Sequence, residues 1–265
     1  MAMQGEVIIA TYNREKELSQ CLYHIEQAAL KPQRVIIIDA TPDYRFDYKG
    51  NLNILYKNSS EQGSSVQRNE GIECLLDNTD IVTFLDDDFY VDEDYFANLY
   101  SAFERDETLV GAGGALRRDG DFVTQNMPQN DKDVNSLYGC NMSFRVAQIG
   151  DTRFDENLKL YAFMEDWDFS YRMAQKGSMK RLWNCTGEHD RAPNKPVDDR
   201  KMGYMIVANS CYLKRKNHIY HYSDTLYYLA YICKHMCLWW QRRSRQRFLG
   251  AVQGFIKVVI KKESL

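Results

Sequence analysis

The sequence predicts an α/β protein with a mostly parallel central sheet and helices on both faces of that sheet. Short apolar runs alternate along the chain with stretches in which apolar residues recur at helical spacing. The apolar runs do not alternate with polar residues, which is typical of parallel strands buried on both sides. The 265 residues are 44% hydrophobic and 27% charged, which excludes a disordered chain and allows one large core with an appendage.

The first half contains the clearest elements. A helix preceding Pro32 follows from the spacing of its apolar residues, and β-branched runs mark the strands on either side. We expect strands over residues 6–10, 34–39, 52–56 and 81–85, and helices over residues 18–29 and 63–76. A nucleotide site is expected where the carboxyl ends of such strands meet.

The second half is less regular, although several segments still have a recognisable pattern. We expect a glycine-containing strand over 109–116, a polar loop or hairpin over 119–135, a helix over 161–176, a short strand over 179–183 and a polar loop over 184–196. Two helical stretches, 198–216 and 223–262, complete the chain, so a helical C-terminal extension follows the α/β part.

The net charge of −3 conceals two regions of opposite sign. Residues 1–213 hold 23 Lys/Arg against 35 Asp/Glu, a net charge of −12, whereas residues 214–265 hold 11 against 2, or +9. An acidic body suits a metal-bound or carboxylate-based site. A basic, aromatic tail suits an anionic surface, either a membrane leaflet or a nucleic acid.

The cysteines and the N-terminus indicate a cytoplasmic protein. The 7 cysteines include no CxxC pair, which favours free thiols in a reducing compartment over disulfides or a zinc site. No signal peptide is visible at the N-terminus, and no uninterrupted apolar run reaches the ~18 residues of a spanning helix.

Three consecutive carboxylates end the strand over 81–85. Asp86, Asp87 and Asp88 would repel one another unless a cation or hydrogen-bond donors offset their charge. Hard oxygen ligands of this kind hold Mg²⁺ or Mn²⁺, which commonly bridge diphosphates. The alternative is an acidic turn that caps a helix beginning near Asp92.

A second acidic cluster, Glu165-Asp166-Trp167-Asp168, lies among aromatic residues that would raise the pKa of a carboxylate toward that of a general base. Acids at a helix N-terminus explain the same pattern and are compatible with catalysis. His189 follows a strand in the polar loop; a lone histidine is more often structural, but one imidazole could complete a Mn²⁺ shell formed with carboxylates.

Polar residues also follow the first two strands, at the same rim of the sheet. Thr11, Asn13 and Arg14 follow the first strand, and Asp39 ends the second. A carboxylate there can accept the imide N–H of uracil or thymine, and guanine remains open. Arg68 and Asn69 offer donors to phosphate or base from the next helix.

Together these segments resemble glycosyltransferase family 2, whose fold is GT-A, over roughly residues 5–216. The segments occur in the family's order: Thr11–Arg14 (TYNR), Asp39, Gly63–Gly71 (GSSVQRNEG), Phe84–Asp88 (FLDDD), Gly139–Arg145 (GCNMSFR) and Glu165–Arg172 (EDWDFSYR). Two departures are modest: Ala10 occupies the family's usual proline, and Ala40-Thr41-Pro42 replaces a serine- or glycine-rich turn.

The resemblance implies inverting transfer of a sugar from a nucleotide-diphosphate donor, with UDP-sugar favoured, to an acceptor hydroxyl. It implies Mn²⁺ or Mg²⁺ at Asp88 and His189, and Asp166 as the catalytic base. The implied donor-binding residues are Thr11, Asn13, Arg14, Asp39, Arg68, Asn69, Asp86 and Asp87, and the acceptor-side residues are Gly139, Cys140, Asn141 and Glu165. The catalytic domain would be residues 1–216, divided into a nucleotide-binding half (1–110) and an acceptor-binding half (111–216).

Three other readings compete with this one. A sugar nucleotidyltransferase would need a basic, glycine-rich triphosphate loop where this chain has TYNRE. A non-catalytic, membrane-associated scaffold would not need Asp88, Asp166 and His189 intact. Nucleic-acid binding through the basic tail is the third reading, and we expect no nucleic-acid partner.

Residues 217–265 are expected to form basic, aromatic helices at a membrane surface. An apolar stretch over 226–240, interrupted by Lys234 and His235, ends in Trp239 and Trp240 and is followed by the basic residues 242–247. This pattern suits the headgroup boundary of an anionic leaflet. The enzyme would then lie on the inner face of the cell membrane, near a glycan or lipid-linked acceptor of bacterial cell-surface polysaccharide synthesis. Alternatively, the helices pack on the catalytic domain or form a homodimer.

Overall fold

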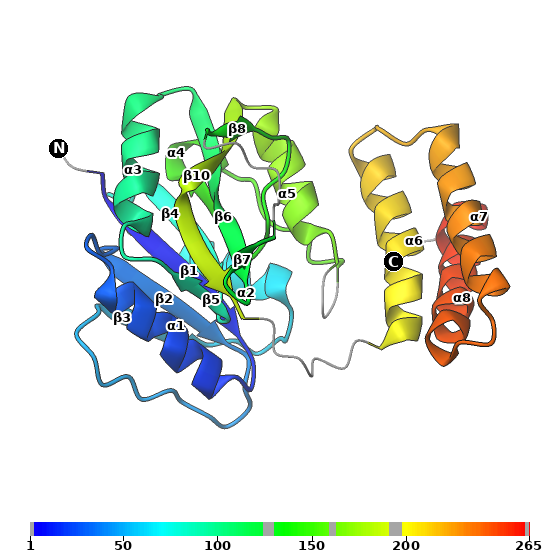
Figure 1. Ribbon diagram of the computed structural model, residues 1–265, viewed down its shortest axis with the longest axis horizontal. Helices are drawn as coiled ribbons and strands as arrows, with labels where there is room; N and C mark the ends of the chain where they lie inside the picture. The colour runs from blue at the N-terminus through cyan, green and yellow to red at the C-terminus, as the bar shows by residue number, and fades with distance from the viewer. Residues whose placement is uncertain (1–2, 124–129, 159–162, 191–197, 263–264) are drawn as a thin grey trace. The chain divides into compact units, whose positions relative to one another are not determined.

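The computed structural model describes residues 3–123, 130–158, 163–190, 198–262 and 265 (Figure 1). The chain forms two compact units, residues 1–192 and 193–265. The elements of the first unit are β1 (Gly5–Thr11), α1 (Glu15–Gln27), β2 (Arg34–Asp39), β3 (Ile54–Asn58), α2 (Ser64–Glu73), β4 (Ile81–Asp86), β5 (Phe89–Val91), α3 (Tyr95–Arg105), β6 (Leu109–Arg118), β7 (Asp121–Phe122), β8 (Lys132–Asp133), β9 (Asn141–Arg145), α4 (Val146–Ile149), α5 (Glu165–Ala174) and β10 (Ser178–His189).

Within the described residues, the strands form one sheet with the order β3-β2-β1-β4-β9-β6-β10-β5, to which β7 and β8 are added. β1, β2, β3 and β4 run parallel, as do β6 and β10, and β9 is antiparallel to both of its neighbours. The mostly parallel sheet that the sequence predicts is therefore confirmed. The register places Thr11 opposite Asp39 and Ala10 opposite Asp86, so these strands end at one edge.

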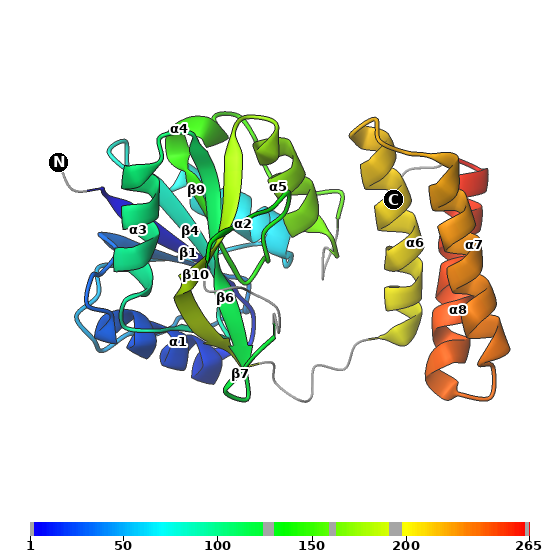
Figure 2. The ribbon, with the colours of Figure 1, turned by 45° about the horizontal axis from the view of Figure 1, so that its top comes forward.

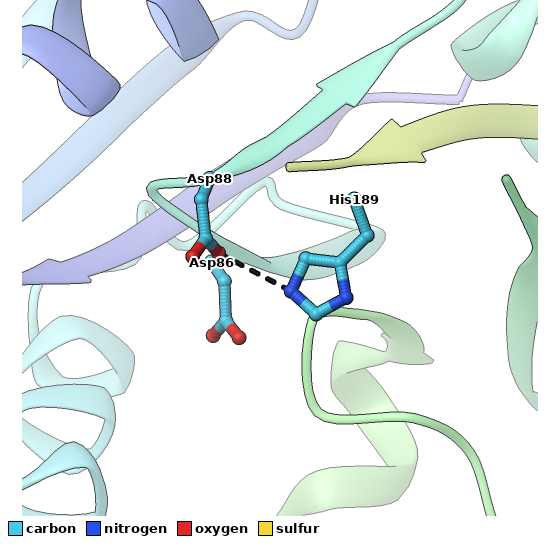
Figure 3. Close-up of side chains that lie close together, drawn as sticks. All are labelled: Asp86, Asp88 and His189. Carbon is cyan, nitrogen blue, oxygen red and sulfur yellow. Dashed lines mark ion pairs between the residues drawn. The ribbon is translucent and has the colours of Figure 1, made fainter. Parts of the chain in front are cut away.

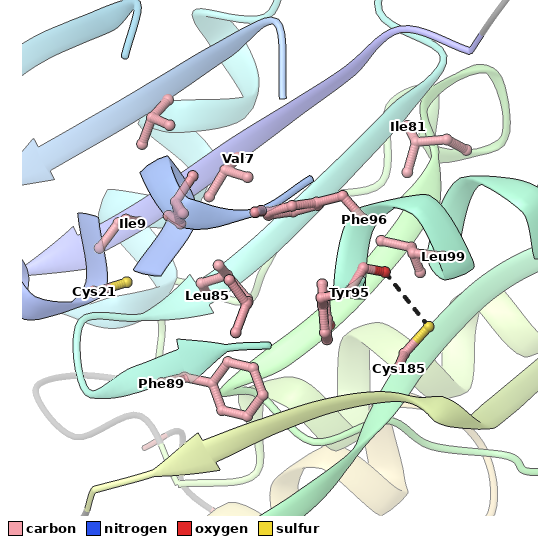
Figure 4. Packing of buried hydrophobic residues seen from close by; sticks show 14 of the residues in the cluster. Val7, Ile9, Cys21, Ile81, Leu85, Phe89, Tyr95, Phe96, Leu99 and Cys185 are labelled. Carbon is pink, nitrogen blue, oxygen red and sulfur yellow. Dashed lines mark hydrogen bonds between the residues drawn. The ribbon is translucent and has the colours of Figure 1, made fainter. Parts of the chain in front are cut away.

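Helices cover both faces of the sheet because neighbouring residues of each strand point to opposite sides. Val7 and Ile9 of β1 pack with α1 and α3, whereas Ile8 packs with α2 and α5 (Figure 2). Figure 4 shows the first of these layers, in which the aromatic rings of α3 fill the space beside β4 and Cys185 of β10 lies against Tyr95. These strands are buried on both sides, which explains their continuous apolar runs.

β10 is the largest difference from the expected elements. A strand over 179–183 followed by a polar loop was expected, but the strand continues to His189. It pairs with β6 through an irregularity between Leu182 and Thr186, which offsets the register by more than one residue. Several of its side chains are only partly buried, so the polar sequence NCTGEH resembles a loop, although Gly187 and Glu188 pair with β5 on one side and with β6 on the other.

Other segments differ in smaller ways. Residues 141–145 form β9, inserted between β4 and β6, where the sequence showed no strand. The predicted helix over 161–176 is α5, whose described part begins at Glu165; residues 161 and 162 lie outside the described residues. For residues 119–135 a polar loop or a hairpin was expected, and β6 and β7 form an antiparallel hairpin at its start. Residues 124–129 of this segment also lie outside the described residues.

The second unit consists of α6 (Asp199–Lys216), α7 (Tyr222–Cys237), α8 (Arg242–Gly254) and a π-helical segment, η1 (Phe255–Ile260). The expected domain boundary followed Lys216, whereas α6 belongs to the second unit. The reason is tertiary packing: Val207 and Cys211 of α6 form a core with Tyr228 of α7 and Ala251 of α8. When a helix lies between two domains in the sequence, its pattern shows which of its sides is apolar. The pattern does not show which domain that side packs against.

Glycines allow α6 and α8 to approach at backbone distance. A Cβ at Gly250 would overlap the carbonyl oxygen of Arg200, and one at Gly203 would overlap that of Arg247. We therefore expect Gly250→Val to lower the free energy of unfolding of the second unit by about 1–3 kcal/mol, because the helices must separate. Urea unfolding followed by circular dichroism measures this change. The exposed Gln253→Val on the same helix is the control, and equal stability of the two variants would contradict the close packing.

Candidate functional site

The acidic turn and His189 are brought together by strand pairing. Asp86 ends β4, and Asp87 and Asp88 form the turn into β5. β5 pairs antiparallel with the end of β10, which sets His189 opposite Phe89, and the Asp190 N–H donates to the Asp88 carbonyl over 2.9 Å. His189 therefore lies in a strand beside the acidic turn, not in the polar loop that the sequence indicated.

Asp86, Asp88 and His189 form a three-residue cluster suited to a divalent cation. Their candidate ligand atoms all lie within 4.8 Å of one another. Figure 3 shows the Asp88 carboxylate facing the imidazole, with 3.3 Å between Asp88 Oδ1 and His189 Nε2. Asp88 and His189 are 2% and 6% exposed, and among the described residues Asp88 Oδ1 has no hydrogen-bond partner. Two carboxylates and an imidazole, with a buried carboxylate oxygen left free of hydrogen bonds among the described residues, match the ligand preferences of Mn²⁺ and Mg²⁺.

Arg14 and Thr11 hold the other oxygens of the acidic turn. Arg14 lies 2.8 Å from Asp87 Oδ1 and 2.7 Å from Asp88 Oδ2, and Thr11 Oγ1 donates to Asp87 Oδ2 over 2.7 Å. Burial raises the pKa of Asp87 to about 7, against the attraction of Arg14. Burial also opposes ionisation of Asp88, but His189 and Arg14 outweigh it and lower the pKa of Asp88 to about 2. Asp88 therefore keeps its negative charge at neutral pH.

The rim next to this turn carries Asp39 and Asn13. The buried Asp39 accepts hydrogen bonds from the Thr41 N–H and the Tyr56 hydroxyl, both over 2.8 Å. Asn13 has a left-handed backbone with φ 53°, and its N–H donates to Thr41 Oγ1 over 2.8 Å. Each carboxylate oxygen can accept more than one hydrogen bond, so Asp39 retains the capacity to bind an imide donor.

Arg68 joins the acidic cluster to the start of α5. Its guanidinium is buried and donates to Glu165 Oε1 over 2.8 Å, to Asp86 Oδ1 over 3.1 Å and to the Gly139 carbonyl over 3.0 Å. Two carboxylates from distant segments thus share one cation. The sequence indicated that Arg68 offers hydrogen-bond donors to a phosphate or base, but it did not show either of these carboxylate partners.

Asn69 is directed elsewhere, although the sequence grouped it with Arg68. Its amide nitrogen donates to the Phe154 carbonyl over 3.0 Å and to Glu156 Oε1 over 2.8 Å, and its amide oxygen accepts from the Phe154 N–H over 2.8 Å. Neighbouring residues of a helix point in different directions. Asn69 therefore anchors the segment around Phe154, while Arg68 faces the acidic residues.

Glu165 and Asp166 begin α5 and have different environments. Asp166 accepts hydrogen bonds from the N–H groups of Gly139, over 3.0 Å, and of Trp167, over 2.8 Å. Burial and the neighbouring Asp166 charge raise the pKa of Glu165 to about 8, against the attraction of Arg68. Burial and the Asp166 charge therefore oppose ionisation of Glu165, whereas its ion pair with Arg68 favours it. Asp168 is fully buried and pairs with Arg172 over 2.7 Å.

Gly139, Cys140 and Asn141 connect the two acidic clusters through their backbone. Gly139 binds Asp166 with its N–H and Arg68 with its carbonyl, and the Cys140 carbonyl accepts from the Asp86 N–H over 3.1 Å. A Cβ at Gly139 would lie 3.2 Å from the Asp166 Cβ, so the backbone approaches closely here. Among the described residues, the fully buried side-chain amide of Asn141 has no hydrogen-bond partner.

Sequence reasoning missed a cavity of about 190 Å³ beside His189. It is lined by Tyr90, Arg118, Asp119, Glu188, His189 and Asp190. Arg118 Nε is buried there and has no hydrogen-bond partner among the described residues. No local pattern could have identified this cavity, because it lies where β5, β10 and the turn after β6 meet.

Comparison with known proteins identifies the fold and the family. The model of the family described as glycosyl transferase family 2 matches residues 6–168. A search of curated proteins found no match. Among solved structures, S. aureus TarS 1-349 in complex with UDP-GlcNAc has a TM-score of 0.62 and 18% identity, covering 80% of this chain and 66% of that one. GalNAc-T7 with UDP, GalNAc and Mn²⁺ has a TM-score of 0.58 and 12% identity, covering 83% and 50%.

A crystal structure of S. aureus TarS has a TM-score of 0.57 and 18% identity, covering 77% of this chain and 40% of that one. This chain thus spans less than two thirds of the length of these structures. At such low identities the likeness establishes the fold, and it confirms the GT-A architecture predicted from the sequence. The family model covers more than half of the 265 residues. The chain therefore belongs to glycosyl transferase family 2.

Proposed function

We propose that this protein is a metal-dependent, inverting glycosyltransferase that moves a sugar from a nucleotide-diphosphate donor to an acceptor hydroxyl. The observation that carries the proposal is the cluster of Asp86, Asp88 and His189, in which the buried Asp88 Oδ1 lies 3.3 Å from His189 Nε2 and has no hydrogen-bond partner among the described residues. Arg68 connects this cluster to Asp166. UDP-sugar is the favoured donor because Asp39 offers an acceptor for the uracil imide and because TarS was solved with UDP-GlcNAc.

Each residue has a defined role in this reaction. A divalent cation, Mn²⁺ or Mg²⁺, would neutralise the charge that develops on the departing diphosphate. Asp88 and His189 would hold it, and Asp86 faces the same point. Asp166 would take the proton of the acceptor hydroxyl as that oxygen attacks the sugar carbon from the face opposite the diphosphate, which inverts the configuration. Gly139 and Trp167 orient the Asp166 carboxylate.

We place the reaction in bacterial cell-surface polysaccharide synthesis, with a glycan or lipid-linked acceptor. The support is the second unit, whose residues 193–265 hold 14 Lys/Arg against 4 Asp/Glu, a net charge of +10. No helix in the described part of the chain is long and apolar enough to cross a membrane. We therefore propose that the second unit attaches the enzyme peripherally to the anionic inner face of the cell membrane.

A nucleotide-sugar screen tests the catalytic proposal. In the presence of Mn²⁺, a UDP-sugar is expected to raise the melting temperature of the purified protein by several degrees, because it binds only the folded state. The matching UDP-sugar should then be hydrolysed slowly without an acceptor, with release of UDP. Binding without any turnover would instead support the scaffold reading. Pyrophosphate formation from UTP and a sugar phosphate would support a nucleotidyltransferase.

A further inference from the structure

The second unit carries an apolar helix face that no other described residue of that unit covers. Asp224, Tyr228 and His235 of α7 are buried on its inner side, toward α6 and α8. The opposite side, which we call the outer face of α7, is apolar along its length. It consists of Tyr222, Leu226, Leu229, Ala230, Cys233, Met236 and Cys237, all exposed. Their recurrence every three or four residues places them on one side of the helix.

The exposure of this face is substantial. Tyr222 is 77% exposed, Met236 52% and Leu226 50%. Trp240, which follows the end of α7, is 73% exposed. Scattered surface apolar residues are normal, but a continuous apolar face on an otherwise charged unit marks an interaction surface.

The orientation of α7 is fixed by polar contacts on its inner side. Lys214 of α6 contacts Asp224, and Ser210 of α6 hydrogen-bonds to the Tyr228 hydroxyl over 3.0 Å. The Asp224 carboxylate also accepts from the His221 N–H over 2.8 Å at the start of the helix. These contacts lie opposite the outer face, so substitutions on that face leave them intact.

Charge decides which partner suits this surface. The second unit has a net charge of +10. A second copy that docked through its own second unit would bring the same positive charge to the contact, and like charges oppose association. An anionic lipid surface supplies the opposite charge, attracts Arg242 and Arg245 at the start of α8, and accommodates tryptophan and tyrosine rings at its headgroups.

We propose that the outer face of α7 inserts into the headgroup region of an anionic membrane leaflet, with the helix parallel to the membrane plane. This inference rests on the membrane association proposed above and adds the surface that makes the contact. The apolar side chains provide burial, and Arg242 and Arg245 provide electrostatic attraction. The two contributions respond differently to salt, because salt screens the surface potential but not apolar burial.

Vesicle binding tests this face directly. The full-length L226E/M236E variant is expected to bind phosphatidylserine-containing vesicles on the order of tenfold more weakly than the wild type. The reason is that a glutamate carboxylate at either position must lose its hydration when the face enters the headgroup region. The control is Q20E/Q253E, which has the same charge change at exposed polar positions away from the outer face of α7 and from Trp240. Co-sedimentation measures the binding, and circular dichroism with thermal unfolding checks the fold. Equal binding of the two variants would overturn the proposal.

A second measurement does not depend on these variants. A thiol-reactive environment-sensitive fluorophore on Cys233, in a Cys237→Ser protein, is expected to shift its emission to the blue when anionic vesicles are added. No shift while the protein binds the vesicles would overturn insertion of this face. A wild-type dimer that dissociates in L226E/M236E would assign the face to a second copy instead.

The outcome can be separated from that of the catalytic proposal. Hydrolysis of the donor in solution is expected to be unchanged in L226E/M236E, since α7 contributes no residue to the acidic cluster. Vesicle binding without donor hydrolysis would support the membrane face and contradict the transferase proposal. Donor hydrolysis without vesicle binding would support the transferase proposal and contradict the membrane face.

Discussion

Asp88→Asn is expected to reduce sugar transfer by about 10²-fold or more and to weaken Mn²⁺ binding, because a neutral amide cannot supply the charge that Asp88 keeps at neutral pH. Steady-state kinetics and calorimetry with Mn²⁺ alone measure the two effects separately. An excess of chelator should abolish activity of the wild type, and added Mn²⁺ should restore it.

Asp190→Asn is the matched control for this substitution. Asp190 adjoins His189 but is exposed and is not part of the three-residue cluster. Its variant should retain both activity and Mn²⁺ affinity. Full activity of the wild type in chelator, or unchanged Mn²⁺ affinity of Asp88→Asn, would contradict the assigned metal site.

Asp166→Asn is expected to lower kcat by a factor on the order of 10² or more while donor affinity changes little, because a general base acts in the transition state. The Gly139 and Trp167 N–H groups bind different oxygens of Asp166, and asparagine keeps only one of these acceptors, so circular dichroism must show that the variant is folded. Kinetics and donor calorimetry on the same preparation measure both parts.

Glu165→Gln distinguishes between the two neighbouring acids. Burial and the Asp166 charge raise the pKa of Glu165, and glutamine keeps an oxygen for Arg68, so this variant should retain donor binding and most of its turnover. A fully active Asp166→Asn with an inactive Glu165→Gln would assign the base to Glu165. Asp168 does not compete for this role, because it is fully buried against Arg172.

The strand-end positions of Asp39 and Asp86 could be predicted from the sequence. Each follows an apolar run that is buried on both faces, and parallel strands necessarily end at a common edge. The acidic start of α5 was also predictable, since its carboxylates precede a helical pattern. These features depend on local periodicity, which a sequence records directly. The roles assigned to these residues remain predictions.

Other features depend on partners distant in the chain. His189 was expected in a loop, because the end of β10 is polar and its pairing with β5 joins segments about 100 residues apart. The sequence shows that residue 68 is a charged arginine, but it does not show that this side chain lies between Asp86 and Glu165. Asn69, the adjacent residue, showed no sign that it would anchor a different segment.

The sequence by itself determined the composition of the C-terminal helices, including their apolar stretch and their excess of positive charge. Only the tertiary structure decided that α6 packs with them and which side of α7 remains exposed. The physical reason is that α7 is apolar on most sides, so periodicity cannot distinguish the side buried in the unit from the side left for a partner. That distinction is made by contacts such as Ser210 with Tyr228 and Lys214 with Asp224, which exist only in the folded unit.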